Sequence, residues 1–160
     1  MREVWSLFFN KDNNLLQKNI IKSNDLFVNP IDIADNNIPN GNSVYLLICS
    51  KLSNITKEKS WTEKVNVLSK SFNTFINFNF SQMFSYLKIL DICEENITVT
   101  IHGKVNNKLK KEILKKFMGN ISIIYKENEE EFFVVICKSQ TCSQKLKDLN
   151  QINEYIKNNL

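Results

Sequence analysis

Three stretches in the first half of the chain place apolar residues at helical spacing. In the clearest one, apolar side chains recur at alternating intervals of four and three residues, as in Trp61, Val65, Leu68, Phe72 and Phe75. The stretch before it begins near Asn42 or Ser43, either of which can cap a helix, and runs to about Ile55. The stretch after it runs from Phe80 to Leu90. Because the connections are short, we expect neighbouring helices to be antiparallel and to form helical hairpins.

The pattern changes near Asp91. Apolar and polar residues then alternate over 97–102, which predicts a half-buried strand. We further expect a helix over 105–117, ended by Gly119, strands over 121–125 and 132–137, and a last helix after Asp148. Gln151, three residues after Asp148, completes a plausible capping pair. The predicted fold class is α+β, with helical hairpins over 1–92 and a small strand–helix–strand–strand–helix unit over 93–160.

Composition and charge exclude several classes of protein. Apolar residues make up 42% of the 160 residues, enough for a hydrophobic core. The net charge of +4 is shared between the two halves, and the lysine-rich stretch 108–116 includes Glu112 on a predicted helix. We therefore expect a solvated helix face there rather than a phosphate-binding patch, and no nucleic-acid partner. The longest apolar runs have six residues and the start has no signal-peptide layout, so we expect a soluble, cytoplasmic protein without a membrane partner.

The four cysteines are expected to be reduced thiols, because the chain shows no export signal. Cys137 and Cys142 form the most notable pair. A zinc site would need two further ligands, such as His102 and Cys93, and a redox or disulfide-forming pair is a second possibility. Ordinary packing and turn residues are the third. We expect the pair to lie close together across a turn, without a bridge and without metal, and we expect no cofactor.

Two segments carry a resemblance to a known family. The first, residues 28–44, reads VNPIDIADNNIPNGNSV, in which a Pro leads into a Gly-Asn-Ser-Val helix start. The second, residues 135–143, reads VICKSQTCS, in which two cysteines precede a terminal helix. Both resemble segments of the thioredoxin-domain-containing, spermatogenesis-associated protein 20-like family. Trp61 and the strand that ends before Lys104 fall in the same order as in that family. Lys145 departs from it, since the closing motif tends to have Pro there.

The resemblance implies a larger protein, with an amino-terminal thioredoxin-like domain followed by a helical toroid of the six-hairpin glycosidase type. This chain resembles only the last hairpins of an incomplete (α/α) toroid and a small α/β unit. No Cys-x-x-Cys occurs, so the thioredoxin-like chemistry cannot reside here. Our leading hypothesis is a non-catalytic carboxy-terminal fragment. Its expected partner is the missing amino-terminal part encoded by a split gene, or a second copy bound through exposed helix faces around Ile48, Leu52, Trp61 and Phe72.

Three residues are candidates for catalysis. Asp35 and Asn42 belong to the Pro- and Gly-bearing loop and the helix start after it, where helical toroids place sugar-processing groups. The alternative hypothesis is therefore that this chain contributes loop residues to a glycosidase- or epimerase-like pocket that the rest of the toroid completes. Structural roles in turn formation and capping compete with this interpretation. His102 is the single imidazole of the chain and is expected to be a partly exposed residue at a strand end.

Overall fold

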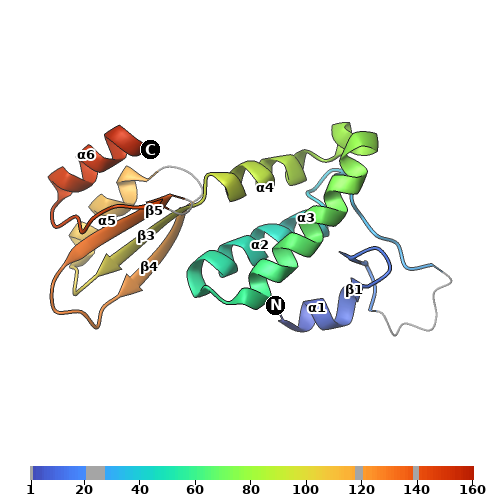
Figure 1. The fold of residues 1–160 in the computed structure, drawn as a ribbon, viewed down its shortest axis with the longest axis horizontal. Helices are drawn as coiled ribbons and strands as arrows, with labels where there is room; N and C mark the ends of the chain where they lie inside the picture. Colours follow the sequence, from blue (N-terminus) through green and yellow to red (C-terminus); the bar gives the residue numbers. More distant parts are fainter. Residues whose placement is uncertain (1, 21–27, 118–120, 139–140) are drawn as a thin grey trace. The chain divides into compact units, whose positions relative to one another are not determined.

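The protein is described by a computed structural model that covers residues 2–20, 28–117, 121–138 and 141–160. It has an α+β fold, as expected (Figure 1). The chain divides into two compact units, Met1–Cys93 and Glu94–Leu160. This boundary lies one residue after the one expected from the sequence. Within the described ranges, no helix combines the length and the apolar character that crossing a membrane requires.

The first unit is mainly helical. Its elements are α1 (Arg2–Phe8), β1 (Phe9–Asn10), β2 (Leu15–Leu16), α2 (Gly41–Thr56), α3 (Lys59–Asn79), the 3₁₀ turn η1 (Phe80–Gln82) and α4 (Phe84–Glu94). Figure 1 shows α2 and α3 lying side by side, joined by a turn of two residues. In this turn Lys57 adopts a left-handed conformation, and its N–H donates to the carbonyl of Ser53 at 2.9 Å. That bond ends α2 and allows the chain to reverse at once.

The core of the first unit confirms the helical stripe predicted from Trp61. Trp61, Leu68 and Phe72 are buried at one face of α3. They pack with residues from β2, α2 and α4 and with the residue before α4, namely Leu15, Leu16, Tyr45, Leu46, Cys49, Tyr86, Ile89 and Met83. The ring of Phe72 stacks on that of Tyr86 with centroids 4.4 Å apart. Burial of these large side chains is the main source of stability for the helical unit.

Two expectations for the helical unit are wrong. The helix expected from Phe80 does not begin there, since η1 occupies residues 80–82 and α4 begins at Phe84. In addition, Trp61 and Phe72 are buried rather than left on an uncovered face, whereas Ile48 and Leu52 are half-buried. Large exposed apolar side chains occur instead where α3 passes into α4. Phe78, Phe80 and Phe84 are exposed there by 86%, 60% and 64%.

The second unit is a sheet with two helices. Its elements are β3 (Ile97–His102), α5 (Asn107–Lys116), β4 (Ile121–Lys126), β5 (Phe133–Lys138), β6 (Thr141–Cys142) and α6 (Leu149–Asn159). The strand order is β4-β3-β5-β6. β3 and β4 are parallel and joined through α5, whereas β5 runs antiparallel to both β3 and β6. The unit therefore contains one β–α–β crossover followed by a hairpin.

The core of the second unit lies between one face of this sheet and the two helices. It consists of alternate strand residues and of one buried position from each helix, namely Val99, Ile101, Val134, Ile136, Ile113 and Ile152, together with Leu146. The predicted cap is confirmed, because Asp148 Oδ1 accepts hydrogen bonds from the N–H groups of Asn150 and Gln151. Gly119, the expected end of the preceding helix, lies outside the described residues.

Gly103 has a conformation that other residues rarely adopt. It follows β3 with a φ of 79°, and its N–H donates to the carbonyl of Lys126 at 2.9 Å. A Cβ at this position would lie 2.7 Å from the carbonyl oxygen of Glu131. Glycine is therefore required both by the backbone angle and by the close approach of the segment that leads into β5.

Candidate functional site

The start of α2 is fixed by Asn40. Its side-chain oxygen accepts a hydrogen bond from the N–H of Ser43 at 2.8 Å, which is the usual contact of a helix cap. The sequence predicted that Asn42 or Ser43 would cap this helix, and that prediction is wrong by two or three residues. Asn40 is 4% exposed, so the cap lies in the interior of the unit. Because Asn40 is the cap, the side chain of Asn42 is available for other hydrogen bonds.

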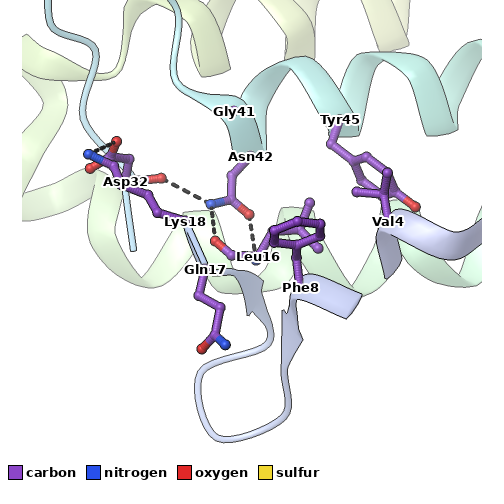
Figure 2. A pocket seen from close by; sticks show the side chains of 9 residues that line it. All are labelled: Val4, Phe8, Leu16, Gln17, Lys18, Asp32, Gly41, Asn42 and Tyr45. Atoms are coloured by element: carbon purple, nitrogen blue, oxygen red, sulfur yellow. Dashed lines mark hydrogen bonds and ion pairs between the residues drawn. The ribbon is translucent and has the colours of Figure 1, made fainter. Parts of the chain in front are cut away.

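Asn42 fastens the loop segments to the helix. Its Oδ1 accepts from the N–H of Leu16 at 2.7 Å, and its Nδ2 donates to the carbonyls of Leu16 at 2.8 Å and Asp32 at 3.0 Å (Figure 2). The side chain thus bonds to both the N–H and the carbonyl of Leu16 in β2, which lies 26 positions away. Asn42 is 3% exposed, and its two bonds to Leu16 are buried, whereas its bond to Asp32 is partly buried. Both polar atoms of the Asn42 amide therefore have a structural role.

Asp35 braces the loop against α4. Oδ1 accepts from the backbone and side-chain N–H groups of Asn40 at 2.9 and 3.0 Å, and Oδ2 accepts from the N–H of Ser85 at 2.6 Å. Burial raises the pKa of this carboxyl, but the hydrogen bonds from Ser85 and Asn40 outweigh that effect, and the net pKa lies below its ordinary value of 3.8. Asp35 therefore stays ionised as an acceptor, which suits a brace and not a general acid.

A cavity of about 290 Å³ opens beside the start of α2. Its walls are formed by α1, by β2 and the two residues after it, by the loop that holds Asp32, and by the start of α2 (Figure 2). The lining residues are Val4, Phe8, Leu16, Gln17, Lys18, Asp32, Gly41, Asn42 and Tyr45. At its rim, Lys18 Nζ and Asp32 Oδ2 form an ion pair at 2.7 Å. The cavity thus combines an aromatic wall with a half-exposed charge pair, an arrangement that can hold a small polar molecule with an apolar face.

Two titratable groups near this cavity do not act as nucleophiles or bases. Cys49 is fully buried, and burial raises the pKa of its thiol to about 11. Burial also raises the pKa of the Tyr45 hydroxyl above its ordinary value of 10.0. Both groups are therefore protonated at neutral pH. A thiol in this state is a packing group, because nucleophilic attack requires the thiolate.

His102 lies in the other unit and differs from its expected setting. It is 8% exposed, not partly exposed, because its ring stacks on Phe133 with centroids 4.1 Å apart. The Nδ1–H donates to Glu129 Oε1 at 2.9 Å. A carboxylate within hydrogen-bond reach is one requirement of acid–base catalysis. The buried ring, however, offers little surface to a substrate.

Cys137 and Cys142 are joined by a disulfide, so the expectation of an unbridged pair is wrong. The two residues face each other directly across β5 and β6, with Cα atoms 4.0 Å apart. The expected proximity is confirmed, whereas the expected turn includes residues 139–140, which lie outside the described residues. Directly opposed residues on antiparallel strands come close enough for bridging without any movement of the backbone. Among the residues that the structure describes, no group of three or more metal-ligating side chains comes together.

The structure thus brings two of the three catalytic candidates into one neighbourhood. Asp35 and Asn42 both act at the start of α2, whereas His102 pairs with a glutamate in the second unit. The sequence pattern missed Asn40, although an Asn before a glycine-led helix start is a usable capping signal. It gave no means of pairing His102 with Glu129, because four acidic residues follow each other closely in the turn 127–131.

No protein-family model matches the chain, and no curated protein matches its sequence. The resemblance to the thioredoxin-domain-containing, spermatogenesis-associated protein 20-like family therefore depends on the quoted segments alone. One of these segments, residues 28–44, contains the cap Asn40, the brace Asp35 and the fastening residue Asn42.

Proposed function

We propose that this chain is a non-catalytic carboxy-terminal part of a protein of the thioredoxin-domain-containing, spermatogenesis-associated protein 20-like family. In this proposal the helical unit supplies the last hairpins of an (α/α) toroid, and the sheet unit is the appendage that follows them. The chain acts by joining the amino-terminal part of the same protein, encoded separately. The identity of that partner follows from the resemblance of residues 28–44 and 135–143.

The observation that supports the non-catalytic role is that the polar side chains of Asp35 and Asn42 form hydrogen bonds within the chain. Both the oxygen and the nitrogen of the Asn42 side-chain amide bond to backbone groups, and Asp35 accepts three hydrogen bonds from N–H groups. A catalytic acid or base must lie within hydrogen-bond reach of its substrate, whereas these two side chains are directed at groups of the chain itself. Cys49 and Tyr45, which lie next to this loop, are held in their neutral forms by burial.

Exposed aromatic side chains support joining to a partner. Phe78, Phe80 and Phe84 lie within seven positions of the chain, and each is exposed by 60% or more. Large aromatic side chains contribute strongly when they are buried in protein–protein contacts. A toroid continued by earlier hairpins would offer such a contact to the point where α3 passes into α4.

The test is co-purification with the protein encoded by the adjacent upstream reading frame. We expect a one-to-one complex by light scattering after gel filtration. The double variant Phe78→Ser/Phe84→Ser should weaken this complex, whereas Phe75→Leu, a change at a half-buried position of α3, should not. A chain that remains alone in the presence of an upstream product bearing a Cys-x-x-Cys domain would contradict the proposal.

One observation favours a second function, a contribution to a carbohydrate-processing pocket. The cavity beside α2 contains Asp32, whose carboxylate is half-buried and is bound only by the side chain of Lys18 among the described residues. In the completed protein, Asp32 could bind a sugar hydroxyl from this position. Asp32→Asn should then abolish sugar binding, measured by calorimetry on the complex, while Asp12→Asn should leave it unchanged. Binding that persists in Asp32→Asn would exclude this function.

The cytoplasmic location expected from the sequence is part of the proposal. Its test is cell fractionation with an antibody against this chain, in which we expect the signal in the cytoplasmic fraction. In that compartment the Cys137–Cys142 bridge meets thiol reductants, and disulfides found there are mostly transient or catalytic.

A further inference from the structure

The disulfide at the β5–β6 hairpin is not what holds the hairpin together. Val134 and Leu146 exchange two backbone hydrogen bonds of 2.8 and 2.9 Å. Ser143 N–H donates to the carbonyl of Ile136 at 2.8 Å, and Ser143 Oγ accepts from Ile136 N–H at 3.0 Å. The bridge joins residues only five positions apart, and short loops gain the least from a cross-link. The segment therefore stays on β5 when the bridge opens.

The two sulfurs of the bridge differ in their surroundings. Cys142 is exposed on the edge strand β6, whereas Cys137 is half-buried on β5. Cys142 also lines an open hollow of about 520 Å³ between the segment after β6 and α6. The hollow is lined largely by polar side chains, among them Gln144, Gln151 and Asn158. The exposed end of the bridge is therefore at Cys142, next to this polar hollow.

We propose that the Cys137–Cys142 disulfide is a thiol–disulfide exchange site and that Cys142 carries the sulfur that an external thiol attacks. The thiolate of the external compound forms a bond to Cys142 Sγ. The Cys137–Cys142 bond breaks, and its electron pair leaves on Cys137 Sγ, which takes up a proton from water. A second external thiol then attacks the mixed disulfide and releases Cys142, which is also protonated. The chain gains two electrons and two protons, and the external thiols become a disulfide.

The shared chemistry of the partner is an accessible thiol, from a small molecule or from a protein. Exposure decides which sulfur is attacked, because exchange rates depend on access to the sulfur. The other two cysteines serve as internal references. Both lie in the described part of the helical unit and form no disulfide there, and Cys49 is fully buried.

The first experiment uses the unmodified chain, purified without reductant. Reduced glutathione is added, the reaction is quenched with acid at short times, and tryptic peptides are analysed by mass spectrometry. Lys138 separates Cys137 and Cys142 into different peptides. We expect the glutathione adduct on Cys142 to exceed that on Cys137 by about tenfold. An equal distribution, a preference for Cys137, or a chain that is purified without the bridge would overturn the proposal.

The second experiment reverses the reaction in single-cysteine variants. Oxidised glutathione is added to Cys137→Ser and to Cys142→Ser, each checked for folding by circular dichroism. We expect Cys142 to form the adduct about ten times faster in the first variant than Cys137 does in the second. Similar rates would overturn the assignment of the attacked sulfur. Cys49→Ser in the otherwise unmodified chain should leave the adduct pattern unchanged.

A third arm distinguishes the two sources of the thiol. Reduced glutathione and a synthetic peptide bearing Cys-x-x-Cys are compared at equal thiol concentration. Faster opening of the bridge by the peptide assigns the site to a protein dithiol, and faster or equal opening by glutathione assigns it to small thiols. A bridge that neither compound opens would overturn the proposal.

Discussion

The two units are organised by different kinds of contact. In the helical unit, side chains of one short loop and of the first turn of α2 bond to backbone groups far away in sequence, as Asp35 does to Ser85 and Asn42 does to Leu16. In the sheet unit, backbone ladders join β3, β4 and β5, and the hydrogen bonds between side chains and backbone groups are local, as in the caps of α5 and α6. A unit built on a few side chains is vulnerable at those residues. A unit held by backbone ladders is destabilised most where the backbone leaves no room for a side chain, as at Gly103.

Two spectroscopic probes report on the units separately. Both tryptophans, Trp5 and Trp61, lie in the helical unit, where Lys64 Nζ lies 5.4 and 4.7 Å from their ring centroids. The single histidine, His102, lies in the sheet unit. Tryptophan fluorescence therefore follows unfolding of the first unit, and the proton resonances of the imidazole follow unfolding of the second.

The largest effect is expected from Asn42→Ala. The change leaves the N–H and carbonyl of Leu16 without their partner in a buried place, and each such loss costs about 1–3 kcal/mol. The carbonyl of Asp32 also loses its partner, in a partly buried place. We expect the free energy of unfolding, followed by tryptophan fluorescence in urea, to fall by about 3–5 kcal/mol. Asn36→Ala, at an exposed loop position, is the matched control and should change it little. A loss below about 1 kcal/mol would contradict the fastening role.

The next effect is expected from Gly103→Ala in the sheet unit. The substitution places a Cβ 2.7 Å from a backbone oxygen and imposes a positive φ on alanine, so we expect a loss of about 2–4 kcal/mol. The imidazole resonances of His102 should report it. Gly41→Ala is the control, because its Cβ would meet nothing within 4 Å. There we expect no loss, or a gain of about 0.5 kcal/mol. Equal effects of the two changes would show that Gly103 is not required.

Much of the fold could be predicted from the sequence because its patterns are local. The spacing from Trp61 describes one helix and the face that it buries. The alternation over residues 97–102 predicted the strand β3, but its expectation of a half-buried strand is wrong, because Thr98 and His102 on the other face are buried too. The cap Asp148 was predicted for the same reason, since its partners are two and three residues away. The start of the helix expected from Phe80 was misplaced, because helical periodicity alone does not show where a helix is interrupted.

The candidate site could be predicted only in part. The loop with Asp35 and Asn42 was identified, but their partners Ser85 and Leu16 lie 50 and 26 positions away, at distances along the chain where no local pattern operates. The disulfide was rejected on grounds of cellular compartment, and the directly opposed register of β5 and β6 was not foreseen. Register depends on the geometry of the connection between two strands, which residue types alone do not determine.

The third prediction concerns the pH dependence of the helical unit. The pKa of Asp35 is lower in the folded chain than its ordinary value of 3.8, so ionised Asp35 contributes stability above that value. This contribution disappears as the pH falls through the folded-state pKa. We expect Asp35→Asn to lower the free energy of unfolding by about 1–2 kcal/mol near pH 6, because Ser85 N–H would then face an amide donor. Near pH 3 the difference between the variant and the unmodified chain should shrink. A difference that is the same at both pH values would show that the charge of Asp35 does not stabilise the unit.

The smallest effect is expected from Asp148→Ala, which removes the cap of α6. Asp148 Oδ1 accepts from two N–H groups at 2.8 and 2.9 Å, and Gln151 Oε1 accepts from the N–H of Lys147 at 2.8 Å. The cap is exposed, so water replaces part of what is lost, and we expect a loss of about 1 kcal/mol. Asp148→Asn keeps an acceptor and should cost only about 0.3–0.5 kcal/mol, through the lost charge at the helix start. The imidazole resonances of His102 should follow both changes in urea. Because α6 buries Ile152 in the sheet unit's own core, tryptophan fluorescence should not respond. A fluorescence shift as large as the imidazole shift would mean that the two units unfold as one, and the comparison drawn between them would then fail.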